Sequence, residues 1–299
     1  MASPTLTPAV LPSEPELRCF AAAAAQLLIA RLPRAGGWRA GSRRAGVGLQ
    51  HFDHRDYAPG DEVRHIDWRQ TARQHRPILR RFESESVSDW TLVLDASSSM
   101  AVQDGAKWCS AVRMAAAMAY ALLQLGHRVG VLVYGERVLA QVARGRGQHH
   151  YAAIARLLAA LQPARSGQGS QLGVCSPYLH GAASVFVIGD FLADGEMQRD
   201  LGALAQHCTA LHVMQLRAAA ETDLQLAGDF DLEDVETGAR LPVRAGTHAN
   251  RLAAAERAAM TQRLRSFCSR SAVAFTDWDI AQPWQHTLLG HLVQARSRC

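Results

Sequence analysis

The sequence lacks the long hydrophobic runs that mark a membrane protein. Within its 299 residues no apolar stretch reaches the roughly 18 to 20 residues that a membrane-spanning helix needs. The best candidate, residues 21–30, is rich in Ala and interrupted by Gln26, which is typical of a helix in a soluble protein. No basic segment followed by an apolar core opens the chain, so no signal peptide is indicated. We expect a cytoplasmic protein with no membrane span and a loose tail over residues 1–15.

Cysteine and lysine are used sparingly. The six cysteines are scattered, and no two have the spacing of a zinc site. A chain of this length can bury a large core without cross-links, so we expect reduced thiols. Lys107 is the sole lysine, and every other basic side chain is an arginine. The many alanines accompany this bias, which is typical of a GC-rich genome, so the arginine enrichment itself indicates no function.

The signatures of several common enzymes are missing. The sequence contains no Gly-x-x-x-x-Gly-Lys-Ser/Thr phosphate-binding loop and no His-Glu-x-x-His zinc motif. It also lacks the Gly-x-Ser-x-Gly nucleophile elbow. His65 and Asp67 alternate along one segment, but no residue there supplies a nucleophile for a triad. His149 and His150 lie at an expected helix start and are interpreted as solvated.

From Trp90 onward, short apolar segments alternate with segments rich in Ala and Leu. We expect strands over residues 91–94, 128–134, 138–142, 183–188, 210–216 and 272–277, and helices over residues 107–125, 151–161, 196–207, 249–269 and 284–295. An edge hairpin over residues 230–243 is expected to turn at Thr237-Gly238. This alternation predicts an α/β fold over residues 89–299, with a doubly wound, mostly parallel sheet covered by helices on both faces. Residues 16–88 are expected to form an irregular N-terminal extension.

Two acidic residues directly follow apolar strands, at the edge of the sheet where ligands bind in such folds. Asp95 ends the first strand and is followed by Ser97 and Ser99. Asp190 follows the strand at 183–188, and a Gly-rich loop brings a further hydroxyl at Ser170. Carboxylates and hydroxyls suit a hard divalent cation, Mg²⁺ first, with Ca²⁺ or Mn²⁺ as alternatives. The competing interpretations are a plain turn at Asp95 and a helix cap at Asp190.

Two carboxylates and three neutral hydroxyls give a divalent ion fewer negatively charged ligands than a tight storage site provides. Such a centre has room for water, or for a carboxylate from another protein. It therefore suits a metal-bridged protein contact better than tight storage of the ion. Whether Ser170 reaches the centre stays open, because residues 163–177 show no firm pattern.

Arginines outnumber acidic residues between Arg31 and Phe82. The candidate docking residues in this part of the chain are Arg55, Asp56, Tyr57, Asp61, Arg64, Asp67, Trp68 and Arg73. The competing interpretation is a structural ion-pair network, in which Ile66 and Trp68 pack inward while Asp56 and Asp67 pair with arginines. A basic strip also occurs in nucleic-acid-binding proteins. No zinc finger, helix-turn-helix or aromatic ribonucleoprotein motif accompanies it, so we expect no nucleic-acid partner and favour docking to an acidic protein surface.

These motifs resemble two known patterns. Asp95-Ala96-Ser97-Ser98-Ser99-Met100 resembles the metal-ion-dependent adhesion site of von Willebrand factor type A domains. Residues 55–73, with Arg80-Arg81-Phe82-Glu83, resemble the long and specific signature of the bacterial domain-of-unknown-function family fifty-eight. The resemblance implies a von Willebrand factor type A-like fold for the later part of the chain.

The family resemblance also implies a partner and a ligand set. Its members are usually encoded beside MoxR-type AAA+ ATPases, and this short form is similar to the subunit found in methanol dehydrogenase gene clusters. Carried over by motif, the metal ligands are Asp95, Ser97, Ser99, Ser170 and Asp190. Two positions depart from the family pattern. Gln171 replaces an acidic residue, and the usual Gly-x-Gly-x-Glu-Phe motif lacks its glutamate at Gly46 to Phe52.

These observations favour a non-catalytic, soluble adaptor. Its metal centre would accept an acidic residue of a client protein, and it would act with a MoxR-type ATPase in assembly or maturation of that client, with methanol dehydrogenase as a candidate. The rival hypothesis is a magnesium-dependent hydrolase or phosphotransferase that uses Asp95, with Lys107 near the phosphate.

Overall fold

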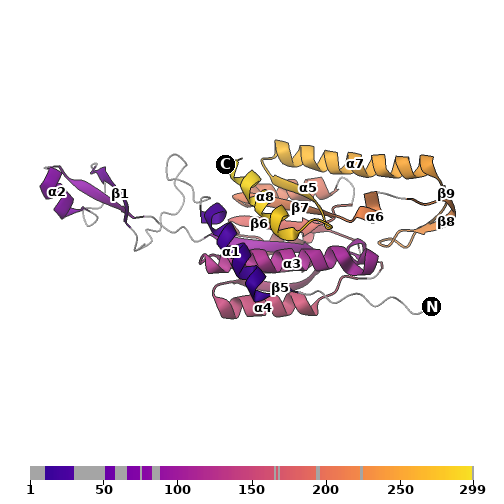
Figure 1. The fold of residues 1–299 in the computed structure, drawn as a ribbon, viewed down its shortest axis with the longest axis horizontal. Coiled ribbons are helices and arrows are strands. Elements are labelled where there is room, and N and C mark those ends of the chain that lie inside the picture. The colour runs from indigo at the N-terminus through magenta and orange to yellow at the C-terminus, as the bar shows by residue number, and fades with distance from the viewer. Residues whose placement is uncertain are drawn as a thin grey trace. The chain divides into compact units, whose positions relative to one another are not determined.

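The computed structural model describes residues 11–29, 51–57, 66–74, 76–82, 88–164, 166–167, 169–192, 196–222 and 225–297. These residues belong to two compact units, and Figure 1 labels many of their helices and strands. The first unit combines residues 1–31 with residues 88–299, and the second comprises residues 32–87.

A six-stranded sheet forms the centre of the first unit. Its strands are β3 (Asp89–Asp95), β4 (Arg128–Tyr134), β5 (Val138–Gly145), β6 (Ser184–Gly189), β7 (Ala210–Arg217) and β10 (Ala274–Asp279). They lie in the order β10-β7-β6-β3-β4-β5. Neighbouring strands are parallel except for β4 and β5, which form an antiparallel pair. The predicted α/β class, with its mostly parallel sheet, is therefore confirmed.

Strand β3 has neighbours on both sides and is apolar on both faces. Leu92 and Leu94 point into one hydrophobic cluster and Val93 into the other, because successive side chains of a strand face opposite ways. All three are fully buried. A run of apolar residues without alternation is typical of a parallel strand covered on both faces, which explains why this strand can be located from the sequence.

Helices cover both faces of the sheet. On one face lie α1 (Glu14–Ile29), α3 (Val102–Gln124), α4 (Gln148–Ala160) and α8 (Trp284–Ser297). On the other face lie the 3₁₀ helix η3 (Leu172–Tyr178), α5 (Glu196–His207) and α7 (Thr247–Arg270). In Figure 1, α5 and α7 lie on the upper side of the strands and α3 lies on the lower side. The short elements η2 (Ser98–Ala101) and α6 (Ala219–Thr222) stand near the carboxyl ends of the strands.

Helix α1 belongs to this unit and not to the expected extension. Ser13 begins the helix as a cap, and its backbone N–H and hydroxyl each donate to the Glu16 carboxylate at 2.8 Å. Leu17 and Phe20 are buried on one helix face, and the Phe20 ring lies 5.3 Å from the Trp284 ring of α8. The predicted tail over residues 1–15 thus overlaps the helix start, and the predicted extension over 16–88 differs from the observed division.

Helix α3 contains a break close to its start. Gln103, Asp104 and Gly105 have φ values of 57°, 54° and 76°, in the left-handed region. The regular part therefore begins near Lys107, where the sequence predicts the helix to start. The helix ends before Gly126, whose φ of 78° is open to glycine without steric cost.

The second unit holds more regular structure than the irregular extension that its composition predicts. Antiparallel strands β1 (His51–Asp56) and β2 (Ile78–Phe82) are joined through α2 (Trp68–Gln74). Asp67 caps α2, since its Oδ1 accepts the backbone N–H groups of Arg69 at 3.0 Å and Gln70 at 3.2 Å. Ile66 and Ile78 are its buried apolar residues within the described part of the unit. With so few apolar residues, the sequence shows little periodicity.

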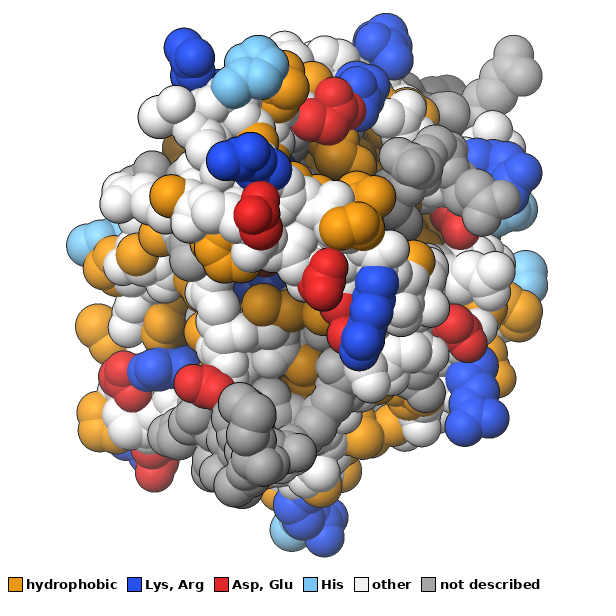
Figure 2. Space-filling view, turned by 90° about the vertical axis from the view of Figure 1, so that its right-hand side faces the viewer, with side chains coloured by type: hydrophobic (Ala, Val, Ile, Leu, Met, Phe, Trp, Pro, Cys, Tyr) orange, Lys and Arg blue, Asp and Glu red, His pale blue; other side chains and the backbone are white. Residues whose placement is uncertain are grey.

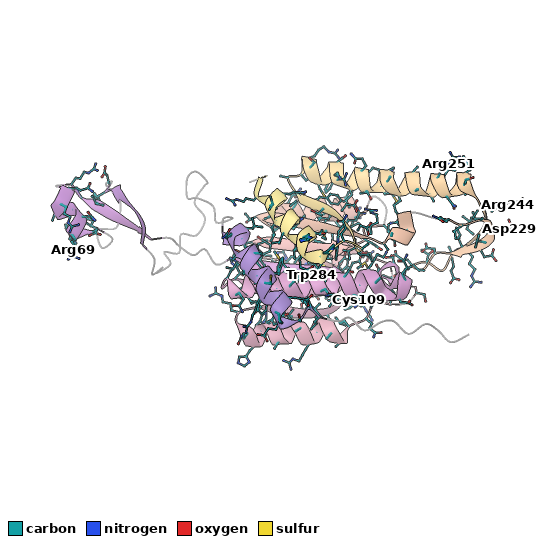
Figure 3. All side chains as sticks on the ribbon, viewed as in Figure 1. Arg69, Cys109, Asp229, Arg244, Arg251 and Trp284 are labelled. Carbon is teal, nitrogen blue, oxygen red and sulfur yellow. The ribbon has the colours of Figure 1, made fainter. Side chains whose placement is uncertain are left out.

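The hairpin predicted at residues 230–243 is present, as β8 (Gly228–Glu233) and β9 (Arg240–Ala245). It differs from the prediction in one respect, because it forms a two-stranded sheet of its own and does not extend the edge of the central sheet. Asp229 and Arg244 face each other at the end away from the turn (Figure 3), where their charged atoms lie 3.8 Å apart.

Candidate metal centre

The loop that follows β3 places three of the candidate ligands together. Asp95 is 0% exposed, and its Oδ1 accepts the backbone N–H of Ser97 at 2.8 Å. The hydroxyls of Ser97 and Ser99 lie 3.0 Å apart, and both side chains are buried. The 3₁₀ turn η2 begins directly after Ser97, so this tight turn brings both hydroxyls back toward the strand end.

Ser170 joins this group from a distant loop. Its hydroxyl donates to Oδ2 of Asp95 at 2.8 Å. The loop is tied to the neighbouring β4–β5 turn, because Gln171 donates its backbone N–H to the carbonyl of Gly135 at 3.0 Å. Ser170 therefore lies at the centre, a point that the sequence left open.

Asp190 lies at the end of β6, beside β3, and is 2% exposed. Its carboxylate does not cap α5, which begins only at Glu196. Instead its Oδ2 accepts a 2.7 Å hydrogen bond from the Nζ of Lys107. The same Nζ donates to Glu221 on α6 at 2.6 Å. One cation thus stands between two carboxylates on one side of the centre.

The electrostatics reflect the proximity of two buried acids. Burial, together with the nearby Asp190 carboxylate, raises the pKa of Asp95 to about 7, although the hydrogen bonds from Ser97 and Ser170 lower it. Burial lowers the pKa of Lys107, but the carboxylates of Asp190 and Glu221 outweigh this effect and raise it overall. Lys107 is therefore a charged ammonium, and Asp95 lacks a comparable positive neighbour among its described partners.

Two backbone features hold the strand ends in place. A methyl group added to Gly189 would lie 2.9 Å from Cβ of Asp95, so only glycine allows β6 to approach β3 this closely. Phe191, directly after Asp190, has a φ of 51°, which is strained for a bulky residue. Its ring is buried in the second hydrophobic cluster, which offsets that strain.

The donor set fits a hard divalent cation on the Asp95 side. Five oxygen-bearing side chains gather there, and two of them are carboxylates with mutually unfavourable charges, which a cation would relieve. Within the described part of the chain, no three His, Cys, Asp or Glu side chains are grouped so as to hold a metal ion. The candidate centre differs from such groups because three of its five donor side chains carry hydroxyls. If an ion binds, Asp190 must act through its second oxygen or through water, since Lys107 occupies Oδ2.

The candidate docking residues are placed differently. Asp56 pairs with Arg76 at 2.9 Å on an exposed surface, and Asp67 caps α2. Within the described part of the second unit Trp68 does not pack inward, because its side chain is 66% exposed. It stands on a two-turn helix with no buried residue, so α2 offers no apolar face to cover it.

The structure describes only some of the other candidate docking residues. Tyr57 is half-buried and Arg73 is exposed. For Arg55 only the backbone, in β1, is described. Asp61 and Arg64 lie outside the described residues. The structure therefore brings no set of these side chains together as a defined surface within the described part of the second unit.

Sequence reasoning missed three charged residues near the centre. They are Glu221, which pairs with Lys107; Arg257, whose guanidinium lies 3.4 Å from Glu221; and Glu236, at the tip of the β8–β9 hairpin. Lys107 gave a usable signal as the sole lysine. Glu221, Glu236 and Arg257 all lie more than a hundred residues after Lys107 in the chain, and no local sequence pattern marks them.

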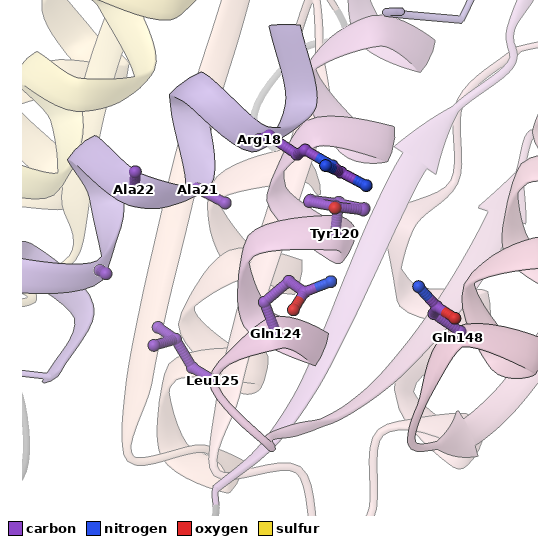
Figure 4. Close-up of a pocket in the computed structure, with 8 residues that line it drawn as sticks. Arg18, Ala21, Ala22, Tyr120, Gln124, Leu125 and Gln148 are labelled. Atoms are coloured by element: carbon purple, nitrogen blue, oxygen red, sulfur yellow. The ribbon is translucent and has the colours of Figure 1, made fainter. Parts of the chain in front are cut away.

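A separate surface hollow of about 480 Å³ lies near the carboxyl end of α3. Figure 4 shows Arg18 and Tyr120 on its wall, together with Gln124 and Gln148. The candidate metal centre lies at the opposite end of α3, so this hollow is not part of it.

The chain belongs to the family described as "Protein of unknown function DUF58", whose model matches residues 53–264. This is the family that the Arg55–Arg73 signature resembles. The chain is 30% identical over 203 residues to "Uncharacterized protein Rv1480" of Mycobacterium tuberculosis and to "Uncharacterized protein Mb1516" of Mycobacterium bovis. The match covers 64% of this chain and 62% of each relative. The names of these relatives assign no enzymatic activity.

Two solved structures are similar in part. The hypothetical protein BatB from Bacteroides thetaiotaomicron is 13% identical, with a TM-score of 0.41 over 70% of this chain and 99% of that one. An aerotolerance-related membrane protein from Bacteroides fragilis is 15% identical, with a TM-score of 0.36 over 61% of this chain and 99% of that one. Scores this low support no functional conclusion. In this chain, none of the described helices has the length and apolar character that crossing a bilayer requires.

Proposed function

We propose that this protein is a metal-dependent adaptor between other proteins. Asp95, Ser97 and Ser99 bind a divalent cation, Mg²⁺ first, with Ser170 and Asp190 completing the protein's share of its ligands. An acidic side chain of a partner takes the remaining position. The observation that carries this proposal is the convergence of two buried carboxylates and three hydroxyls at the carboxyl ends of β3 and β6.

The partner is a MoxR-type AAA+ ATPase, and the outcome is assembly or maturation of a client protein in the cytoplasm. The family resemblance supports this choice, since members are usually encoded beside such ATPases. A subunit of methanol dehydrogenase is the client that the resemblance suggests. The basic and acidic side chains intermingled on the face that carries the β8–β9 hairpin (Figure 2) suit a protein partner better than a uniform polyanion.

The enzymatic alternative is weaker because of Lys107. A phosphoryl-transfer site needs a cation free to meet the transferred group. The Lys107 ammonium is 1% exposed and already held by Asp190 and Glu221. Asp95 would therefore have to act without the one lysine that the chain offers.

The proposal is tested by capture of a MoxR-type ATPase from the same organism, with the tagged full chain in Mg²⁺ or in EDTA. We expect retention by the wild type in Mg²⁺ and loss in EDTA or with Asp95→Ala. Asp229→Ala, on the exposed hairpin strand, is the matched control and should behave as the wild type. Retention that ignores both the metal and Asp95 contradicts the proposal. Turnover of a phosphoester that Lys107→Ala abolishes would favour the enzyme.

A further inference from the structure

The tip of the β8–β9 hairpin contacts the loops of the candidate centre. Both strands of the hairpin are largely exposed, whereas Val235 and Glu236 at its turn are half-buried. The carbonyl of Val235 accepts a 2.8 Å hydrogen bond from the backbone N–H of Gly167. Gly167 belongs to the same loop as Ser170, so the turn is joined to the segment that supplies a candidate ligand.

The turn is held in one conformation by its own hydrogen bonds. The Asp234 carboxylate accepts the backbone N–H of Glu236 at 2.9 Å and the hydroxyl of Thr237 at 2.7 Å. Gly238, with a φ of 71°, donates its N–H to the carbonyl of Asp234 at 2.7 Å. A turn fixed in this way presents Glu236 at little entropic cost.

The Glu236 carboxylate is held beside the candidate ligands. A methyl group added to Gly169 would lie 3.6 Å from its Oε2, which places this oxygen against the Ser170 loop. Burial raises the pKa of Glu236, and the charges of Asp190 and Lys107 act on its carboxylate, Asp190 to raise this pKa and Lys107 to lower it. Glu236 is thus a further acid near the centre, supplied by an element outside the central sheet.

We propose that Glu236 is an internal competitor for the position that a partner's acidic residue takes at the metal centre. This inference rests on the proposed function and adds a regulated step to it. The hairpin offers in the same chain the chemical group that the centre is expected to receive from outside, a carboxylate. The hairpin forms a sheet separate from the one that carries Asp95 and Asp190, so Glu236 can leave the centre without moving the strands that hold these two acids.

The physical consequence is a lowered apparent affinity for partners. A ligand attached to the same chain acts at a high effective concentration, so it competes well even when its own contact is weak. If Glu236 occupies the partner's position in about nine of every ten molecules, the partner's apparent dissociation constant rises about tenfold.

Glu236→Gln tests the competition, because it keeps the size and hydrogen bonding of the side chain and removes its charge. Glu233→Gln is the matched control, since Glu233 is an acid of the same hairpin that pairs with Arg240 on an exposed strand.

The full chain is titrated with Mn²⁺ as the probe. The affinity for Mn²⁺ and the relaxation of water protons by the bound ion are measured first. Binding of a MoxR-type ATPase from the same organism is then measured in Mg²⁺. We expect Glu236→Gln to bind the ATPase about tenfold more tightly and to add an exchangeable water to bound Mn²⁺, with Glu233→Gln unchanged.

The failure of this inference and that of the proposed function are distinguishable. If wild-type Mn²⁺ binding depends on Asp95 but Glu236→Gln changes neither relaxation nor ATPase affinity, only the competitor role of Glu236 is overturned. If Glu236→Gln weakens both Mn²⁺ and ATPase binding, Glu236 is a permanent ligand and the competition is again overturned. If Mn²⁺ binding does not depend on Asp95, the proposed function fails, and the competition fails with it.

Discussion

The hydroxyl of Ser170 donates a 2.8 Å hydrogen bond to Oδ2 of Asp95, across 75 positions of sequence. Together with the backbone N–H of Ser97 at Oδ1, this bond fixes both oxygens of the carboxylate. A carboxylate whose orientation is fixed by two hydrogen-bond donors is pre-organised to bind a metal ion, because binding does not have to order it further. The relationship also ties two loops into one centre, which leads to the first prediction.

Ser170→Ala is expected to lower Mg²⁺ affinity at least tenfold, because it removes both a candidate ligand and the donor that orients Asp95. Ser170→Thr keeps the hydroxyl and should stay close to the wild type. Isothermal titration of the purified chain with MgCl₂ measures both. Equal affinities for the alanine and threonine variants would show that Ser170 has no part in binding the ion.

Metal binding should depend on pH through Asp95. Its pKa, about 7 in the folded chain against an ordinary 3.8, means that the folded protein keeps a proton that the unfolded chain has lost. Without metal, the stability from this proton is complete below pH 3.8 and is lost as pH rises through about 7. An ion must displace the same proton, so Mg²⁺ affinity should rise about tenfold per pH unit up to 7 and level off above.

The measurement is the increase in melting temperature caused by Mg²⁺, followed across this pH range. Asp95→Asn, which cannot titrate at this position, should show a small shift without pH dependence. A metal-induced shift in the wild type that stays constant from acid to neutral pH would contradict the assignment of this proton to Asp95.

Lys107→Met is expected to reduce the free energy of unfolding by about 3–5 kcal/mol in EDTA, since it leaves Asp190 and Glu221 buried without their shared cation. Part of this loss should return in Mg²⁺, because a bound ion replaces the missing positive charge. Urea denaturation with and without Mg²⁺ measures both effects.

The control for Lys107 is Arg240→Met, which breaks an exposed pair with Glu233 and should cost at most about 1 kcal/mol. If Lys107→Met lowers the free energy of unfolding as little as this control does, the ion pairs of Lys107 with Asp190 and Glu221 contribute little to the stability of the fold.

Gly189→Ala is expected to destabilise the fold by about 1–3 kcal/mol, because the new methyl group meets Cβ of Asp95 at 2.9 Å. Moving β6 away from β3 also separates Asp190 from Asp95, so metal binding should fall. Gly290→Ala is the matched control: it meets no atom within 4 Å on helix α8 and should be neutral or stabilise by about 0.5–1 kcal/mol. Chemical denaturation and metal titration of the two variants test this, and equal stability would contradict the close approach.

The part of the centre at the end of β3 can be predicted from the sequence, because the residues that mark it lie within one short segment. Leu92 to Leu94 form an unbroken apolar run, and the acid and hydroxyls follow within one loop. Asp190 is marked in the same way by the apolar strand β6. The pairing of Asp190 with Lys107 and Glu221 has no such signal, since it depends on how α3 and α6 pack against the sheet.

The second unit and the hairpin show where local patterns fail. Trp68 is apolar and predicts burial, yet α2 is too short to form a covered face, and the side chain is exposed. The hairpin's strands and turn follow from residue types such as Thr237-Gly238. Its placement does not, because the contact between Val235 and Gly167 joins segments with no shared pattern.

Anomalous diffraction from crystals of the full chain soaked in Mn²⁺ is the most direct test of the metal centre. We predict a single strong peak at coordination distance from Asp95, Ser97 and Ser99, bordered by Ser170 and Asp190, and its loss in Asp95→Ala crystals. A map without a peak at the end of β3, or with its strongest peak elsewhere on the chain, would contradict the metal centre and the adaptor mechanism built on it.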